Sequence, residues 1–112
     1  MEKLDTLNLN NNKIEGLGPR YFEGMSRLTS LQLDYNKINL VDDEAFYGLE
    51  GRHRIGFLEY PIYFLPEQLQ SMSLQSNKID LFPTMALRPL HQLKTLHLND
   101  NNISRYTIWT GL

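Results

Sequence analysis

The sequence predicts an α/β repeat solenoid, with short parallel strands on a concave side and loops with helical turns on a convex side. First, the pattern L-x-x-L-x-L-x-x-N-x-I occurs four times, at residues 4–14, 28–38, 69–79 and 93–103, with Met72 in place of the second leucine in the third copy. Second, the fixed asparagines of the first two copies are 24 residues apart, as are those of the last two. Third, apolar and polar residues alternate within each copy. A unit this short cannot bury its own apolar face, so the copies must stack.

Each copy, here called a rung, contains one short strand. In Leu7-Asn8-Leu9 and its counterparts, apolar side chains point to one face and polar side chains to the other. Neighbouring rungs are expected to pair in parallel, about 4.8 Å apart. The apolar sides of these strands then form the core of the stack.

The fixed asparagine follows each strand, where the chain turns sharply. A buried turn leaves backbone groups without partners, at a cost of roughly 1–3 kcal/mol each. Asparagine carries both a donor and an acceptor on a short stem, so it can satisfy such groups in successive turns. We therefore predict a buried structural ladder of Asn12, Asn36, Asn77 and Asn101.

The segment that returns from one rung to the next is also patterned. Counting from the asparagine, the tenth residue is Phe22, Phe46 or Leu87, and the thirteenth is Met25, Leu49 or Leu90. Apolar side chains therefore point inward along the convex side as well. Residues 43–49 are expected to form one short helical turn there.

The pattern closely resembles the leucine-rich repeat family. Ala45-Phe46-Tyr47-Gly48-Leu49 is similar to the typical 24-residue subclass, as in Toll-like receptors, Slit-type guidance proteins and small matrix proteoglycans. Residues 65–74 resemble the shorter repeats of the matrix proteoglycans. The resemblance implies a receptor-like or matrix-like protein that binds other proteins. It suggests an extracellular or cell-surface location, although the first residues do not form a signal peptide.

The repeat is interrupted once, because Asn36 and Asn77 are 41 residues apart. Continuing the 24-residue register matches Ile55, Phe57 and Ile62, but places Arg52 at the first leucine position. We therefore expect five rungs, of which the third, near residues 49–66, is degenerate. The alternative is a protruding loop over residues 51–63. The basic run at residues 51–54 is interpreted as a solvated turn.

Residues 1–112 are expected to form a single solenoid domain. The first rung begins at Leu4 and the last return path stops at Leu112, so neither end carries a terminal cap. Open ends favour self-association. They are also expected if the chain is a piece of a longer repeat array.

Composition argues against several other classes. The net charge of −2 gives no basic excess for nucleic acid, and no apolar run is long enough to insert into a membrane. The chain has no cysteine, and its three histidines lack metal-ligand spacing. No nucleophile elbow or phosphate-binding loop is present. We therefore predict no metal, no cofactor and no enzymatic activity.

The concave face is the predicted binding surface for a protein partner. Its outward positions are polar, and the larger or charged residues among them are the predicted contacts. These are Gln32, Asp34, Tyr35, Gln75, His97, Asn99 and Asp100. Lys13, Lys37 and Lys78 follow three of the ladder asparagines and are expected to line one edge.

A structural or assembly role through the uncapped ends is the alternative function. Asn102 begins an Asn-Ile-Ser triplet, which is an N-glycosylation acceptor if the chain is secreted.

Overall fold

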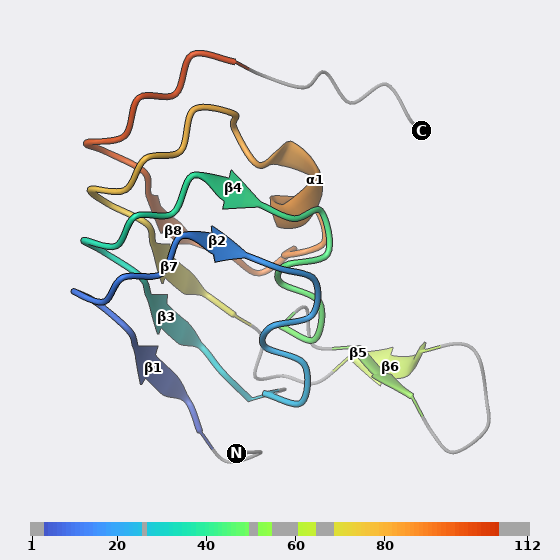
Figure 1. Cartoon of the computed structure of the whole chain (residues 1–112). Coiled ribbons are helices and arrows are strands. Elements are labelled where there is room, and N and C mark those ends of the chain that lie inside the picture. The colour runs from blue at the N-terminus through green and yellow to red at the C-terminus, as the bar shows by residue number, and fades with distance from the viewer. Residues whose placement is uncertain (1–3, 26, 50–51, 55–60, 65–68, 106–112) are drawn as a thin grey trace.

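The computed structural model describes residues 4–25, 27–49, 52–54, 61–64 and 69–105, and for 52–54 and 61–64 only the backbone. Its main feature is a four-stranded parallel sheet with one strand from each rung, in the order β1-β3-β7-β8 (Figure 1). The strands are β1 (Thr6–Asn8), β3 (Ser30–Gln32), β7 (Ser71–Ser73) and β8 (Thr95–His97). Successive rungs are in register, with Leu7 beside Leu31, Leu31 beside Met72 and Met72 beside Leu96.

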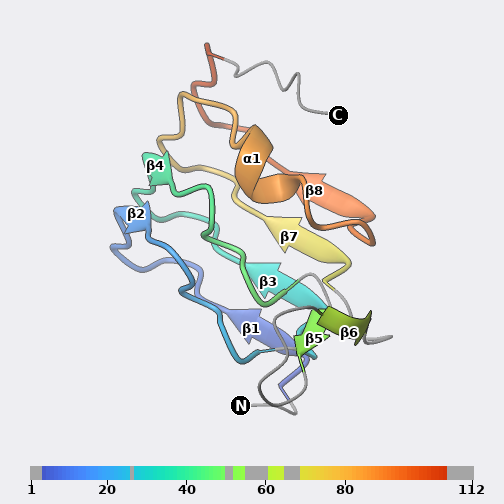
Figure 2. The same ribbon diagram turned by 90° about the vertical axis from the view of Figure 1, so that its right-hand side faces the viewer.

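The return paths lie opposite this sheet (Figure 2). They carry the two-residue strands β2 (Gly16–Leu17) and β4 (Leu40–Val41), which pair in parallel, and the short helix α1 (Thr84–Leu87). The helical turn expected at 43–49 is instead a series of tight turns, in which Ala45, Tyr47 and Leu49 N–H groups each donate to the carbonyl three residues earlier. Short parallel strands on one side and turns with one described helix on the other confirm the predicted α/β solenoid.

The core fills the space between the sheet and the return paths. The inward leucine-type residues of the second and third rungs have exposed fractions of 0–1%, whereas those of the first and fourth rungs are only partly buried. Phe22 and Phe46, from successive return paths, stack with ring centroids 6.3 Å apart. Burying one such side chain contributes roughly 1.5–3 kcal/mol, so the two inner rungs supply most of the hydrophobic stabilisation.

The asparagine ladder joins each rung to the one before it. The Asn36 side-chain oxygen accepts from the Asn12 and Ile14 N–H groups at 3.1 and 3.2 Å. Its nitrogen donates to the carbonyls of Leu9 and Leu33, both at 3.0 Å. Asn77 and Asn101 repeat this arrangement, accepting from Ile38 and Ile79 at 3.1 and 3.0 Å.

Burial along the ladder is uneven, which corrects one expectation. Asn36 and Asn77 are buried, with exposed fractions of 6% and 8%, and Asn101 is half-buried. Asn12, however, is exposed, and its amide nitrogen bonds only to Leu9 and Asn10 in its own turn. The reason is its place in the first rung, because no earlier rung lies within the described residues for its amide to reach.

The expected fifth rung is wrong. β3 pairs directly with β7, and Tyr35 N–H donates to Gln75 O at 3.0 Å, so no rung separates the second and third copies of the pattern. Ile55 and Phe57, on which that expectation was based, lie outside the described residues. Instead, β5 (Arg52–Arg54) and β6 (Pro61–Phe64) pair with each other in an antiparallel two-stranded sheet.

The hydrogen bonds show where the extra residues enter. In a regular repeat, two residues separate the end of the return path from the next rung, and the rung bonds back: Leu28 N–H to Met25 O and Leu93 N–H to Leu90 O, both at 3.2 Å. The equivalent bond at the interruption runs from Leu69 N–H to Leu49 O, also at 3.2 Å. Residues 50–68 therefore replace the usual two residues. This insertion of 17 extra residues accounts for the 41-residue spacing.

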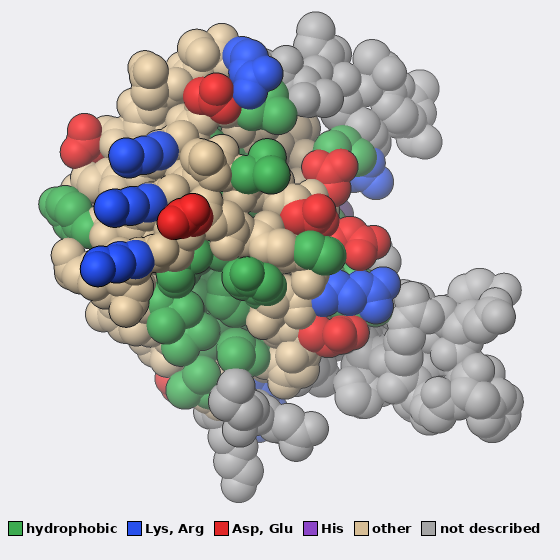
Figure 3. All heavy atoms as spheres, in the orientation of Figure 1, with side chains coloured by type: hydrophobic (Ala, Val, Ile, Leu, Met, Phe, Trp, Pro, Cys, Tyr) green, Lys and Arg blue, Asp and Glu red, His purple; other side chains and the backbone are tan. Residues whose placement is uncertain are grey.

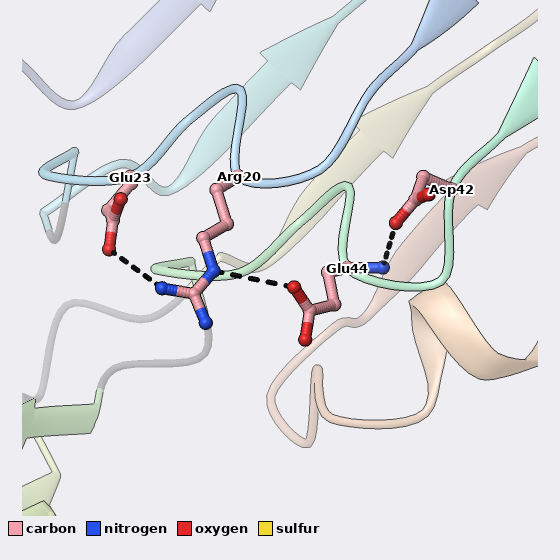
Figure 4. A network of polar contacts seen from close by, with 4 residues as sticks. All are labelled: Arg20, Glu23, Asp42 and Glu44. Atoms are coloured by element: carbon pink, nitrogen blue, oxygen red, sulfur yellow. Dashed lines mark hydrogen bonds and ion pairs between the residues drawn. The ribbon is translucent and has the colours of Figure 1, made fainter.

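A polar network joins the first two return paths on the convex side (Figure 4). Arg20 Nε lies 3.4 Å from Glu44 Oε1, its Nη1 lies 3.7 Å from Glu23 Oε2, and its guanidinium lies 4.2 Å from the centre of the Tyr47 ring. The hydrogen bond to Glu44 raises the pKa of Arg20 above its ordinary value. Because the side chains of Arg20, Glu23 and Glu44 are about half exposed, these two ion pairs contribute little to stability.

The ladder leads to a first prediction. Asn36→Ala should lower the free energy of unfolding by about 2 kcal/mol, because it leaves the N–H groups of Asn12 and Ile14 without their acceptor and the buried carbonyl of Leu33 without its donor. Asn12→Ala is the matched control and should cost much less, since its amide reaches no other described rung. Urea melts of both variants measure the difference, and equal losses would show that the ladder does not hold the rungs together.

The position of the insertion leads to a second prediction. Replacing residues 50–68 by the two-residue linker His-Gln, copied from 91–92, should restore a 24-residue repeat and keep the solenoid folded. The shorter loop should add on the order of 1–2 kcal/mol to stability through reduced closure entropy. Urea melts and circular dichroism test this. Loss of the cooperative transition would mean that the inserted residues are part of the core.

Candidate functional site

The outward side of the β1-β3-β7-β8 sheet brings the predicted binding residues together in rows. The strand register places Asn8, Gln32, Ser73 and His97 in one row across the four rungs. A second row, two residues further along each rung, consists of Asn10, Asp34, Gln75 and Asn99. A third row, directly before the ladder asparagines, consists of Asn11, Tyr35, Ser76 and Asp100. All seven predicted contacts therefore lie in these three rows.

The second row forms a polar ladder of its own, which the sequence analysis missed. Asn10 Oδ1 accepts from the Asp34 N–H at 2.7 Å, and Asp34 Oδ1 accepts from the Gln75 N–H at 2.8 Å. The same Asp34 oxygen accepts the Ser73 hydroxyl. The signal in the sequence is an acceptor side chain at this position in every rung. Asp34, which was predicted as an exposed contact, is half-buried and held by neighbouring rungs.

The third row has an unusual backbone conformation. Asn11, Tyr35, Ser76 and Asp100 all have positive φ, between 58° and 61°. In this conformation the Tyr35 and Ser76 N–H groups point to the next rung and donate to Gln75 O and Asn99 O at 3.0 and 3.1 Å. Asparagine and aspartate tolerate the left-handed region, but a bulky residue there is an outlier. Tyr35 is that outlier, and 54% of its surface is exposed.

The remaining predicted contacts differ in how firmly they are held. His97, Asn99 and Asp100 are exposed on the fourth rung, and Asp100 Oδ2 accepts the Ser76 hydroxyl at 2.8 Å. Gln32 and Gln75 are half-buried, and Gln32 Oε1 accepts from Asn10 Nδ2 at 3.1 Å. Hydrogen bonds to a neighbouring rung thus hold the side chains of Gln32, Asp34 and Asp100.

The lysine edge is present as expected. Lys37 N–H donates to Ile14 O and Lys78 N–H donates to Ile38 O, which places Lys13, Lys37 and Lys78 at equivalent positions on successive rungs. All three are exposed, and Figure 3 shows basic side chains side by side on this edge. Asn102, the candidate glycosylation residue, is exposed on the fourth rung.

The described residues do not gather three or more His, Cys, Asp or Glu side chains into a group able to hold a metal ion. Among the same residues, no helix has both the length and the apolar character needed to cross a membrane. A cleft lined by Asp43, Glu44, Tyr47, Arg88 and His91, among others, lies between the second return path and α1, on the side opposite the sheet.

Comparisons with known proteins agree with this architecture. A family profile described as "Leucine rich repeat" matches residues 2–51. Keratocan of Danio rerio is 30% identical over 108 residues, which cover 91% of this chain and 31% of that protein. Toll-like receptor 3 of Bos taurus is 34% identical over 112 residues, or 97% of this chain and 11% of the receptor. Toll-like receptor 13 of Mus musculus is 39% identical over 56 residues, or 50% of this chain and 6% of the receptor.

The chain thus spans about a third or less of the length of the curated relatives that it matches. The sequence pattern, the parallel rungs, the asparagine ladder and these matches to Toll-like and matrix-type proteins lead to one conclusion. The chain belongs to the leucine-rich repeat family.

Proposed function

We propose that the chain is a non-catalytic protein-recognition module that binds a protein partner through the outward face of the β1-β3-β7-β8 sheet. Leucine-rich repeat domains commonly mediate protein–protein interaction, which supports this class of function. The proposed contacts are the seven residues Gln32, Asp34, Tyr35, Gln75, His97, Asn99 and Asp100.

The single observation that carries the proposal is the backbone conformation of Tyr35. An exposed tyrosine at φ +58° contributes no core packing and costs up to about 1 kcal/mol relative to a residue that tolerates this region. Its counterparts in the other three rungs are Asn, Ser and Asp. Exposed aromatic side chains amid polar groups are favoured anchors of interfaces. Where two other rungs carry asparagine or aspartate, which tolerate this backbone, the second rung thus carries a residue suited to binding.

The polar groups beside Tyr35 support the same proposal. Asp34 is held by Ser73 and by the Gln75 N–H, so its carboxylate has little freedom to lose on binding. Groups fixed before association lower the entropic cost of forming an interface. A partner that covers this face has to supply hydrogen-bond donors near Asp34 and apolar surface over Tyr35.

A double variant tests the concave face. Tyr35→Asn with Asp100→Asn should weaken partner binding at least tenfold, since it removes the aromatic anchor and one charge. Stability should stay equal or rise by about 0.5–1 kcal/mol, because asparagine suits the left-handed backbone at both positions. A partner captured by pull-down and purified provides the assay, with Kd measured by calorimetry.

Tyr21→Asn is the matched control, because Tyr21 is an equally exposed tyrosine, at 59%, on the return side. It should leave the affinity unchanged. Equal affinities of the wild type and the double variant, with both folded, would exclude the concave face as the binding surface.

Association through the ends of the stack is a second candidate function. The inward residues of the two end rungs, including Leu7 and Leu96, are only partly buried, in contrast to Leu31 and Met72. Figure 3 shows hydrophobic side chains gathered at the end formed by the first rung. Contacts between unlike ends build open-ended chains of molecules unless the rotation from one copy to the next closes a ring.

Sedimentation velocity over a wide concentration range tests this candidate. End-to-end association predicts a mean mass that keeps rising with concentration, in the wild type and in the Tyr35→Asn, Asp100→Asn variant alike. A monomer at every concentration would exclude it.

A further inference from the structure

The inserted strands β5 and β6 form a sheet separate from the solenoid. They pair antiparallel, with Arg52 opposite Phe64 and His53 opposite Tyr63, and each has the other as its neighbour in a two-stranded sheet. A two-stranded ribbon is marginally stable in water, and among the described residues neither strand has a second neighbour at its outer edge. Both figures place it on the side where the strands of the main sheet begin (Figures 1 and 2).

The solenoid does not need this ribbon. The bond from Leu69 N–H to Leu49 O closes the base of the insertion with the geometry of a regular repeat. β3 and β7 pair across it without distortion of their register. A 17-residue addition that leaves the stack intact therefore adds surface and contributes no rung.

Charge and backbone chemistry distinguish the two outer edges. β5 is Arg52-His53-Arg54, with a charge of +2 in three residues, whereas the chain as a whole carries −2. All three residues of β5 have a backbone N–H. β6 begins with Pro61, which has none, and an edge with proline is a poorer template for another strand.

We propose that the outer edge of β5 is a docking site for an extended, acidic segment of a partner protein, which adds a third strand to the β5–β6 sheet. Strand addition supplies main-chain hydrogen bonds, and acidic side chains on the added strand complement the two arginines. A second copy of the chain fits poorly, because two β5 edges would bring like charges together. This site is distinct from the concave face and does not depend on binding there.

Synthetic peptides of about ten residues test the proposal. The probe alternates glutamate with valine and threonine and is blocked at both ends. One control replaces every glutamate with lysine. The other keeps the glutamates but is N-methylated at every residue, so it retains the charge and has no backbone N–H to donate from either edge. The full chain should bind the probe at least tenfold more tightly than either control, and less tightly at high salt.

Variants of the chain locate the site. Arg52→Gln with Arg54→Gln should weaken binding of the probe at least tenfold, and the variant with 50–68 replaced by His-Gln should not bind it. The Tyr35→Asn, Asp100→Asn variant should bind it with unchanged affinity. If the shortened chain fails to fold, the affinity of the full-length Arg52→Gln, Arg54→Gln variant for the probe decides whether β5 is the site.

Three results would overturn the proposal. Equal binding of the N-methylated peptide would show attraction by charge alone, as to any polyanion. Unchanged binding after both arginine substitutions would place the peptide elsewhere. Binding lost in the Tyr35→Asn, Asp100→Asn variant would assign the probe to the concave face.

Discussion

The side-chain amide of the ladder asparagines is the interaction on which the stack depends. Leucine burial drives the rungs together, but apolar contact alone does not fix how one buried turn sits on the next. The amides of Asn36 and Asn77 do so, because each satisfies carbonyls of its own rung and the N–H groups of the preceding rung at once. An unsatisfied group in such a turn costs as much as a lost leucine methyl or more. Register along the sheet follows from this.

The two proposed binding surfaces arise in two different ways, by variation of the outward residues on the strands and by insertion of a segment between two rungs. On the concave face, the outward polar residue differs from one rung to the next. Hydrogen bonds from a neighbouring rung then fix it, as those from Ser73 and Gln75 fix Asp34. At the junction between Leu49 and Leu69, a whole segment is added where the chain passes between elements. Neither change disturbs the core, since neither touches an inward position. The scaffold therefore accommodates recognition surfaces of different chemistry at little cost in stability.

Much of this architecture could be predicted from the sequence, because inward leucines and turn asparagines recur with the spacing that stacking imposes. The interruption could not. Ile55 and Phe57 matched the repeat register, yet apolar residues at alternate positions are equally typical of a ribbon such as β5–β6. Whether the segment forms a rung or a ribbon depends on pairing between strands that are distant in the sequence. The local sequence pattern contains no information about such pairing.

The candidate site was predictable in part for similar reasons. The strand period places Gln32 and His97 on the outward face, so their positions followed from the sequence. The hydrogen bonds that fix Asp34 to two other rungs were not predictable in this way, because they involve residues up to 41 positions away in the sequence. The backbone angle at Tyr35 is likewise set by its turn.

The bonds of the ladder also give the stack a direction, because Asn36, Asn77 and Asn101 each reach back to the rung before them. The turn of each of the first three rungs is therefore completed only by the asparagine of the rung that follows it, so removing a rung leaves backbone groups of the preceding one without partners.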